Sequence, residues 1–226
     1  MDKGFQPDKK NWGDPKKVAA RQDTVIDMYR KLFFDKMPPD KQYWSMCSQC
    51  ADHNGNVKKG YEFDHVVSSG LIVPSQFNGV EINPNIHNLN IECSEEAHWY
   101  CSDFYQTMVK KHNHDEFNPH IINADLVEMP KRASKYISKI MYFLVYAADD
   151  VMLVANMIVQ NPWNMKMKTF VEGIIYEFEN ENAFQFAWQN GWTWYDKTYT
   201  YNGTDNNRTV MTTLIFYKKQ KRLKAV

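Results

Sequence analysis

The sequence predicts an α+β protein in which helices and strands occupy different stretches of the chain. Apolar residues recur every three or four positions over residues 15–36, 132–160 and 167–189, a spacing typical of amphipathic helices. Aromatic and β-branched residues instead alternate over 192–201 and 209–217, on either side of a turn-forming segment at 202–207. This second pattern predicts a β-hairpin near the C-terminus.

Each predicted helix has a recognisable end. The first, 15–36, stops before Pro38-Pro39, and the second, 132–160, stops at Asn161-Pro162 because the residue before a proline disfavours helical backbone. The third, 167–189, is followed by Gly191 at the position of a C-terminal cap. Between the first two helices, residues 61–67 are expected to form a strand, 68–88 a long connection and 95–111 a helix.

The region from residue 130 to the end is rich in aromatic residues. Their spacing follows helix and strand periods, which indicates a core role, but exposed rings could also stack on nucleic-acid bases or bind a protein partner. We therefore expect a possible protein partner on this aromatic C-terminal region.

The charge of the chain is balanced. It has 226 residues with 27 Lys and Arg against 27 Asp and Glu, so a general affinity for polyanions is excluded. Contacts to nucleic acid would need local basic clusters, either in the N-terminal arm up to Arg21 or in the C-terminal tail. Solvated termini are the alternative explanation. The basic residues of the tail are Lys218, Lys219, Lys221, Arg222 and Lys224.

The N-terminal twenty residues are polar and carry no apolar run of the signal-peptide kind. No apolar stretch is long enough to span a membrane, so no membrane contact is expected. Together with few, clustered cysteines, these features favour a cytoplasmic protein, in the host cell if a phage encodes it.

The most informative motif is Asp64-His65, which lies between a Cys47-Ser48-Gln49-Cys50 pair and an Asn88-Leu89 segment followed by Cys93. His98 comes five residues after Cys93, and Cys101 follows. An imidazole that titrates near neutral pH can deprotonate a water, and a carboxylate beside it can hold a divalent cation. These are the groups that phosphodiester hydrolysis requires.

In this order and spacing, residues 43–108 resemble the HNH endonuclease family with its ββα-metal finger. The resemblance implies that His65 is the general base, that Asn88 orients the loop, and that Asp64 and His98 bind a catalytic Mg²⁺ or another divalent metal. It also implies a structural Zn²⁺ held by Cys47, Cys50, Cys93 and Cys101. The family pattern is not matched throughout, because the second cysteine pair is eight residues apart and His98 is displaced by one position.

The sequence thus predicts an HNH-like zinc finger with an N-terminal helix, followed by C-terminal helices and a β-hairpin. The expected segments are a basic arm and helix (1–40), the finger region (41–129) and a C-terminal region of unknown role (130–226). The favoured function is a metal-dependent DNA endonuclease, compatible with a phage or mobile-element origin. The alternative is an inactive HNH-like scaffold that binds a protein partner, for example in a phage particle.

Overall fold

The computed structural model describes residues 15–46, 50–51, 54, 56–126, 130–160, 167–195, 199–202 and 209–219. The chain divides into two compact units, Met1–Pro119 and His120–Val226, which we call unit 1 and unit 2. The segments 1–40, 41–129 and 130–226 suggested by the sequence divide the chain at other positions. Both units combine helices with strands, so the predicted α+β content is confirmed, whereas the details of the architecture differ.

Unit 1 begins with the predicted N-terminal helix. It consists of α1 (Pro15–Arg21), a π-helical turn η2 (Gln22–Asp27) and α2 (Met28–Leu32) in unbroken succession. Val25, Ile26 and Tyr29 are buried, as the apolar stripe predicted. The Thr24 hydroxyl donates to the carbonyl of Ala20 at 2.8 Å within the π-helical turn. Such turns interrupt the regular helical hydrogen-bond ladder and often occur near functional sites.

Strands and helices alternate in the rest of unit 1. The elements are β1 (Gln42–Met46), α3 (Glu62–Ser68), the 3₁₀ turn η3 (Pro74–Gln76), β2 (Phe77–Glu81), α4 (Pro84–Cys93), β3 (His98–Cys101) and α5 (Phe104–His112). Three sequence-based expectations are therefore wrong. Residues 61–67 are mostly helix rather than strand, 68–88 contain a strand and the start of a helix, and 95–111 contain the strand β3 before the helix α5.

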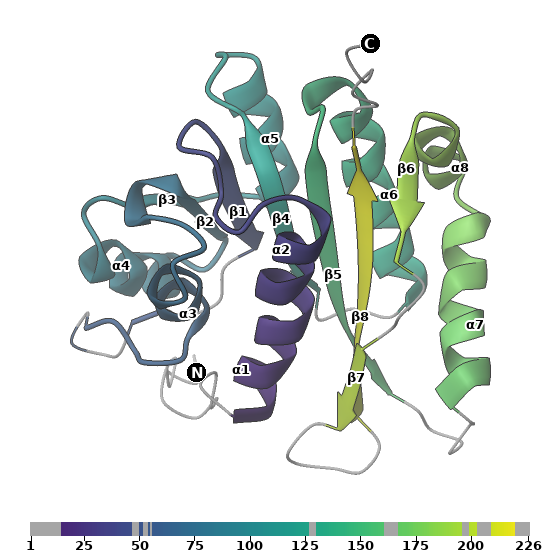
Figure 1. Cartoon of the computed structure of the whole chain (residues 1–226), viewed down its shortest axis with the longest axis horizontal. Helices are drawn as coiled ribbons and strands as arrows, with labels where there is room; N and C mark the ends of the chain where they lie inside the picture. The colour runs from purple at the N-terminus through teal and green to yellow at the C-terminus, as the bar shows by residue number, and fades with distance from the viewer. Residues whose placement is uncertain are drawn as a thin grey trace, which may run out of the picture. The chain divides into compact units, whose positions relative to one another are not determined.

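The three strands of unit 1 are all parallel, in the order β3-β2-β1, and lie side by side in Figure 1. Tyr43 on β1 is in register with Phe77 on β2, and Gly79 on β2 with Trp99 on β3. Parallel neighbours need a crossover between them, which α3 supplies from β1 to β2 and α4 from β2 to β3. Unit 1 is therefore a β1-α3-β2-α4-β3 arrangement.

Aromatic rings cover both faces of this sheet. On one face, Phe63 of α3 contacts Phe77 edge to face at 5.1 Å and Trp99 at 5.7 Å between ring centroids. On the other face, Trp44 stacks on Tyr100 at 5.6 Å. Trp44, Phe77 and Phe63 are buried. A parallel sheet is stable only when both faces are covered, and these rings provide the cover.

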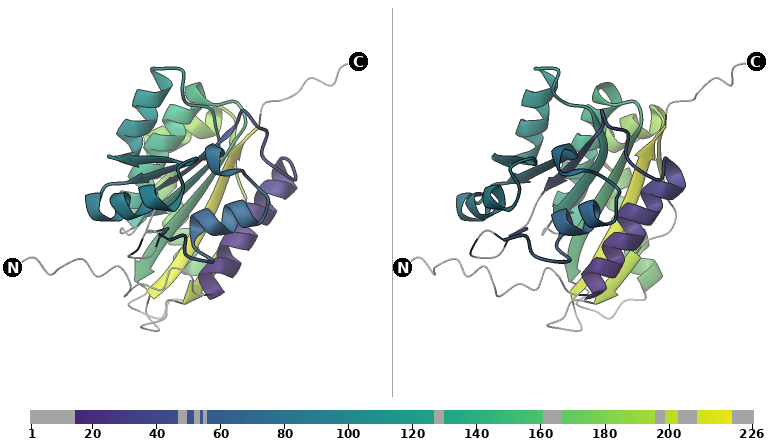
Figure 2. Two further views of the ribbon diagram at one scale, coloured as in Figure 1. Left: turned by 90° about the vertical axis from the view of Figure 1, so that its left-hand side faces the viewer. Right: turned by 60° about the vertical axis from the view of Figure 1, so that its left-hand side comes forward.

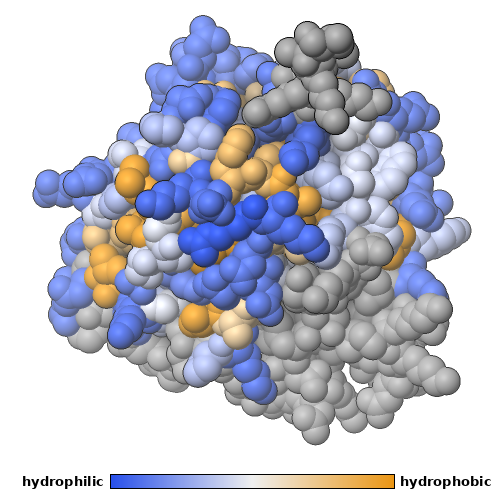
Figure 3. All heavy atoms as spheres, in the orientation of Figure 1, coloured by the Kyte–Doolittle hydropathy of each residue, from blue (hydrophilic) through white to orange (hydrophobic). Residues whose placement is uncertain are grey.

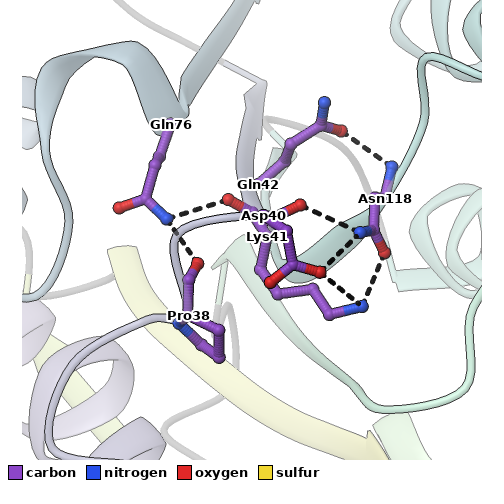
Figure 4. Close-up of polar contacts among 6 residues, drawn as sticks. All are labelled: Pro38, Asp40, Lys41, Gln42, Gln76 and Asn118. Atoms are coloured by element: carbon purple, nitrogen blue, oxygen red, sulfur yellow. Dashed lines mark hydrogen bonds and ion pairs between the residues drawn. The ribbon is translucent and has the colours of Figure 1, made fainter.

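A polar network fixes the start of β1 (Figure 4). The Gln76 amide donates to the carbonyls of Pro38 at 2.7 Å and Lys41 at 3.0 Å. Asn118 receives a hydrogen bond from Lys41 Nζ at 2.7 Å and donates its own amide to the carbonyl of Asp40 at 2.9 Å. The network ties the η3 turn and the segment after α5 to the amino end of β1, which leaves the opposite, carboxyl end of the strands for other roles.

Unit 2 contains β4 (Pro119–Leu126, which starts at the division between the units), α6 (Pro130–Ala147), β5 (Val151–Gln160), α7 (Met167–Glu179), α8 (Asn182–Gln189), β6 (Trp192–Trp194), β7 (Tyr199–Asn202) and β8 (Thr209–Lys218). The predicted helix 132–160 is wrong in its second half, because the chain turns after Ala147 and continues as β5. The predicted helix 167–189 is two helices, α7 and α8.

The sheet of unit 2 is mixed. β4 and β5 are parallel, whereas β8 lies antiparallel between β5 and β6 and also pairs with β7 (Figure 1). The predicted hairpin is therefore found in part, since β6 and β7 both pair with β8 but β8 also forms a long ladder with β5. The helices α6, α7 and α8 pack against one another beside these strands (Figure 2).

Polar side chains cross three strands of this sheet. Asn156 on β5 donates its amide to Asn123 Oδ1 on β4 at 2.9 Å and accepts from the Thr213 hydroxyl on β8 at 2.7 Å. Asn123 and Thr213 are buried. A one-residue slip of either ladder would leave these buried groups unpaired, so the network specifies the strand register.

The mean hydropathy of the chain is −0.61, and hydrophilic residues predominate on the face drawn in Figure 3, where the hydrophobic residues form small separate patches. No helix within the described ranges combines the length and apolar character needed to cross a membrane.

Candidate functional site

The Asp64-His65 pair lies on α3, the crossover helix between β1 and β2. Tyr61 precedes this helix in an extended conformation, and the backbone N–H of His65 donates to the Tyr61 carbonyl at 2.8 Å. The Asp64 carboxylate accepts from the backbone N–H of Gly60 at 2.6 Å. This contact holds the loop that enters the helix and gives Asp64 a structural role.

His65 faces the N-terminal helix. One ring nitrogen, Nε2, lies 3.0 Å from Gln22 Oε1 in the π-helical turn, and Nδ1 is buried. Burial lowers the pKa of the His65 imidazole below its usual value, and the Arg21 guanidinium lowers that pKa further, against the opposing effect of Asp64. The imidazole is therefore predominantly neutral near pH 7 and packed between two helices.

The remaining predicted nuclease residues lie on other elements. Asn88 is exposed on α4, and His98 is exposed at the first position of β3. Asn90, two residues after Asn88, is fully buried and accepts from the backbone N–H of Cys50 at 2.8 Å. Sequence reasoning selected Asn88, but the asparagine that fixes the connection after β1 is Asn90.

The cysteines are distributed over several elements. Cys50 is buried after β1, Cys93 is half-buried at the end of α4, and Cys101 is exposed on β3. Cys47 lies outside the described residues. In the part of the chain that the structure describes, no three His, Cys, Asp or Glu side chains gather where they could hold a metal ion. The predicted catalytic metal group and zinc ligand set are thus not assembled there.

The three described thiols should differ in reactivity. Burial, together with the neighbouring Cys50, raises the pKa of the Cys93 thiol to about 12. Because the thiolate is the reactive form, we expect iodoacetamide at pH 8 to alkylate Cys101 well before Cys93 and Cys50. Peptide mapping by mass spectrometry over a time course measures the order, and alkylation of Cys93 ahead of Cys101 would contradict it.

The predicted DNA-binding tail begins with a residue that has another partner. The Lys218 ammonium on β8 donates to the carbonyls of Val145 at 2.7 Å and Ala148 at 2.8 Å, at the C-terminal end of α6. A cation there satisfies carbonyls that have no partner within the helix. Lys219 is exposed, and Lys221, Arg222 and Lys224 lie outside the described residues. Contact of this tail with DNA stays a prediction.

Lys218→Met tests the capping role. The substitution keeps the apolar stem and removes the ammonium, so we expect unfolding to require about 1 kcal/mol less free energy. Lys135→Met, on the exposed side of α6, is the matched control and should change stability by less than about 0.5 kcal/mol. Denaturant titration of the three proteins gives the comparison, and equal effects of the two substitutions would exclude a cap.

A different residue lies where parallel α/β sheets bind ligands. Glu81 is the last residue of β2, one position beyond Val80, which is in register with Met46 at the carboxyl end of β1. Its Oε1 accepts from the backbone N–H of Asn83 at 2.7 Å. Burial raises the pKa of the half-buried Glu81 carboxyl, while hydrogen bonds from the backbone of Asn83 and Ile82 oppose that rise.

This geometry holds the Glu81 carboxylate in place at the carboxyl end of β2. In open α/β sheets, ligands bind outside the carboxyl ends of the strands. Glu81 escaped the sequence reasoning because Phe77–Glu81 lies in the predicted 68–88 connection. The signal available in the sequence was weak: two apolar residues, Phe77 and Val80, shortly before the acidic Glu81.

No protein-family model matches the chain, and no curated protein is similar to it in sequence. Among solved structures, the chain is similar to TYW2 of M. jannaschii in complex with AdoMet, at 12% identity and a TM-score of 0.49, covering 85% of this chain and 75% of that one. It is also similar to the selenomethionine-substituted CurJ carbon methyltransferase, at 13% identity and a TM-score of 0.39, covering 90% of this chain and 56% of that one.

The predicted HNH endonuclease is wrong. An HNH-like finger requires Asp64 and His65 on a strand of a ββα unit, whereas they lie on a helix that connects two parallel strands. The predictions that followed from the HNH resemblance are wrong as well. They are the hydrolysis of DNA, the catalytic Mg²⁺ bound by Asp64 and His98, the structural Zn²⁺ and the inactive HNH-like scaffold.

Proposed function

We propose that unit 1 binds a nucleoside-containing cosubstrate at the carboxyl ends of β1 and β2, and that the chain is an S-adenosylmethionine-dependent methyltransferase. The observation that carries the proposal is the position of Glu81. A β-α-β-α-β unit with strand order 3-2-1 is the mononucleotide-binding half of the Rossmann-like folds. In such units an acidic residue after the second strand accepts a hydrogen bond from a ribose hydroxyl.

The connection after β1 indicates which kind of nucleoside-containing cosubstrate the site would take. Dinucleotides are held by a G-x-G-x-x-G turn whose backbone approaches the pyrophosphate. Nowhere in this chain are two glycines separated by a single residue, and residues 47–61 after β1 contain only Gly55 and Gly60. The sequence therefore supports a ligand that has a ribose and no pyrophosphate. S-adenosylmethionine has these properties, whereas NAD and FAD do not.

Methyl transfer from a sulfonium places modest chemical demands on the protein. The sulfonium is already activated, so alignment of the acceptor with the methyl group supplies much of the catalysis. In this proposal the Glu81 carboxylate anchors the ribose, and the Asn83 N–H orients the carboxylate. Asn90 holds the connection after β1 through Cys50.

Isothermal titration calorimetry of the full chain tests the proposal. We expect S-adenosylmethionine and its product S-adenosylhomocysteine to bind with Kd values below about 1 mM, the upper end of ordinary enzyme KM values. NAD⁺ and ATP, which carry a ribose and phosphates, should bind at least tenfold more weakly. Absence of binding by both adenosyl compounds, or tighter binding of NAD⁺, would overturn the assignment.

Protein and nucleic-acid partners stay proposals. Exposed aromatic rings on the helices of unit 2 support a protein partner on the aromatic C-terminal region. The exposed fractions are 67% for Tyr146, 63% for Tyr176 and 42% for Trp188. A substrate carried by such a partner is compatible with methyl transfer. Pull-down with Tyr146→Ser and Tyr176→Ser variants, which should lose the partner without unfolding, tests this surface.

A further inference from the structure

A cavity lies within unit 2, far along the sequence from Glu81. It has a volume of about 370 Å³ and is bounded by α7, α8, β6 and β8. This volume falls within the range of small-molecule sites. Its wall is mainly aromatic, formed by Phe178, Phe184, Trp188, Trp194 and Phe216, with Leu214 beside them.

The rings of this wall hold one another in place. Phe178 contacts Phe216 at 5.4 Å between centroids, and Phe184 contacts Phe216 edge to face at 5.9 Å. Phe178 and Phe216 are buried, with 1% and 2% of their surfaces exposed. Trp188 stacks on Phe184 at 5.8 Å and is 42% exposed. The floor is therefore preformed, and Trp188 lies where the cavity meets solvent.

The charge at the cavity is negative. Among the described residues that line the cavity, Glu179, at the end of α7, is the only one with an ionisable side chain, and Gln185 and Gln189 are its polar neighbours. The Gln185 amide donates to the Glu179 backbone carbonyl at 2.8 Å, which fixes the corner between α7 and α8. Glu177 and Glu181 add further negative charge at this corner.

The nearest basic residue on β8 does not neutralise this charge. Lys218 is two positions beyond Phe216, so both side chains point to the same face of the sheet. Its ammonium, however, donates to the carbonyls of Val145 and Ala148 at the end of α6. The aromatic wall and the carboxylate are therefore available to a ligand with a positive charge.

We propose that this cavity binds a small organic cation with a quaternary or tertiary ammonium group attached to an apolar body. Aromatic faces attract such cations through the ring quadrupole, by an amount that grows as water is excluded. The apolar body displaces water from Phe178, Leu214 and Phe216, while Glu179 at the rim complements the charge. A neutral ligand of the same shape gains only the apolar contacts.

The test uses two probes of nearly identical shape, phenyltrimethylammonium and tert-butylbenzene, titrated into the full chain by calorimetry. The cation should bind at least about twofold more tightly than its neutral counterpart, the lower end expected for a cation–π contact at an accessible site. Equal affinity for the two probes would overturn the assignment of a cation, and so would absence of binding by the cation.

Variants then locate the bound cation. Glu179→Gln should weaken the cation about two- to fivefold and leave tert-butylbenzene unchanged, because an accessible ion pair contributes little more than this. Trp188→Ala should weaken both probes. Glu172→Gln, on an exposed position of the same helix outside the cavity, is the control and should change neither. Unchanged cation affinity in both Glu179→Gln and Trp188→Ala would place the cation elsewhere and overturn the proposal.

The two sites can be separated experimentally. Glu81→Gln should weaken S-adenosylmethionine and leave phenyltrimethylammonium unaffected, because Glu81 is in unit 1 and the cavity in unit 2. Failure of S-adenosylmethionine to bind thus counts against the proposed function alone. Loss of phenyltrimethylammonium binding in Glu81→Gln would count against the cavity in unit 2.

Discussion

Replacing Glu81 with glutamine is expected to weaken S-adenosylmethionine binding by about 10- to 100-fold. A hydrogen bond to a charged acceptor contributes about 1.5–3 kcal/mol, and glutamine keeps the shape of the side chain without the charge. The amide oxygen of glutamine can still accept from the Asn83 N–H, so the loop after β2 is retained. Calorimetric titration of the wild type and the variant measures the difference.

Two controls test whether the loss of affinity comes from a contact between Glu81 and the ribose. Glu92→Gln, at an exposed position of α4, changes the net charge by the same amount and should leave affinity within about twofold. An S-adenosylhomocysteine analogue that lacks the 2′-hydroxyl should bind the wild type more weakly, and the Glu81→Gln variant should discriminate little between the two compounds. If removal of the 2′-hydroxyl weakened binding equally in the wild type and in Glu81→Gln, Glu81 would not contact the ribose.

The same residue links binding to pH-dependent stability. Because burial raises the pKa of Glu81, the folded state keeps the proton to a higher pH than the unfolded state does. In the unfolded chain the pKa of this carboxyl is near 4. As the pH rises from that value through the raised pKa of the folded state, ionisation of Glu81 lowers the stability of the fold. Glu81→Gln should melt at or above the wild-type temperature at pH 7, with a smaller gain at pH 4. A carboxylate kept despite such a cost is typical of a functional site.

The second large effect is expected from Gly79→Ala in the middle of β2. A Cβ atom at this position would lie 2.5 Å and 2.6 Å from two ring carbons of Trp99, and 3.0 Å from Phe77. Trp99 has little freedom to move, because its indole N–H donates to the Ser94 carbonyl at 3.2 Å and its ring packs against Phe63 and Phe77. We expect a loss of about 1–3 kcal/mol from overpacking, with a melting temperature several degrees lower.

Gly173→Ala provides a control with the opposite sign. Gly173 lies on α7, and an added Cβ meets no other atom within 4 Å. Alanine is favoured over glycine inside a helix by up to about 1 kcal/mol, so this variant should be as stable as the wild type or more so. Thermal unfolding of both variants tests the pair. A wild-type melting temperature for Gly79→Ala would mean that Trp99 moves away at little cost.

The sequence by itself determined the elements whose signal is local. The N-terminal helix was predicted because Val25, Ile26 and Tyr29 recur at helical spacing, and all three are buried. The first half of the helix predicted at 132–160 was correct for the same reason, since Ile137, Ile140 and Leu144 line one buried face of α6. The helical spacing of apolar residues is visible within each of these segments, so no distant part of the chain is needed to predict the helix.

Tertiary structure decided the segments whose apolar pattern has two possible readings. Val151 to Gln160 is almost continuously apolar, and such a run fits a helix or a strand covered on both faces. It became β5 because β4 and β8 pair with it on either side. Neither partner is adjacent to it in the sequence, so the periodicity of the segment itself could not predict the outcome.

The same distinction separates the predicted site from the observed one. Asp64 and His65 suggested chemistry because of their residue types, but the helix that bears them directs Asp64 to Gly60 and His65 to Gln22. Glu81 gave no motif, and its position became informative only when parallel pairing aligned the ends of β1 and β2. Residue types define which reactions are possible, whereas the pairing of distant strands decides which side chains meet, because strand hydrogen bonds are made between segments far apart in the sequence.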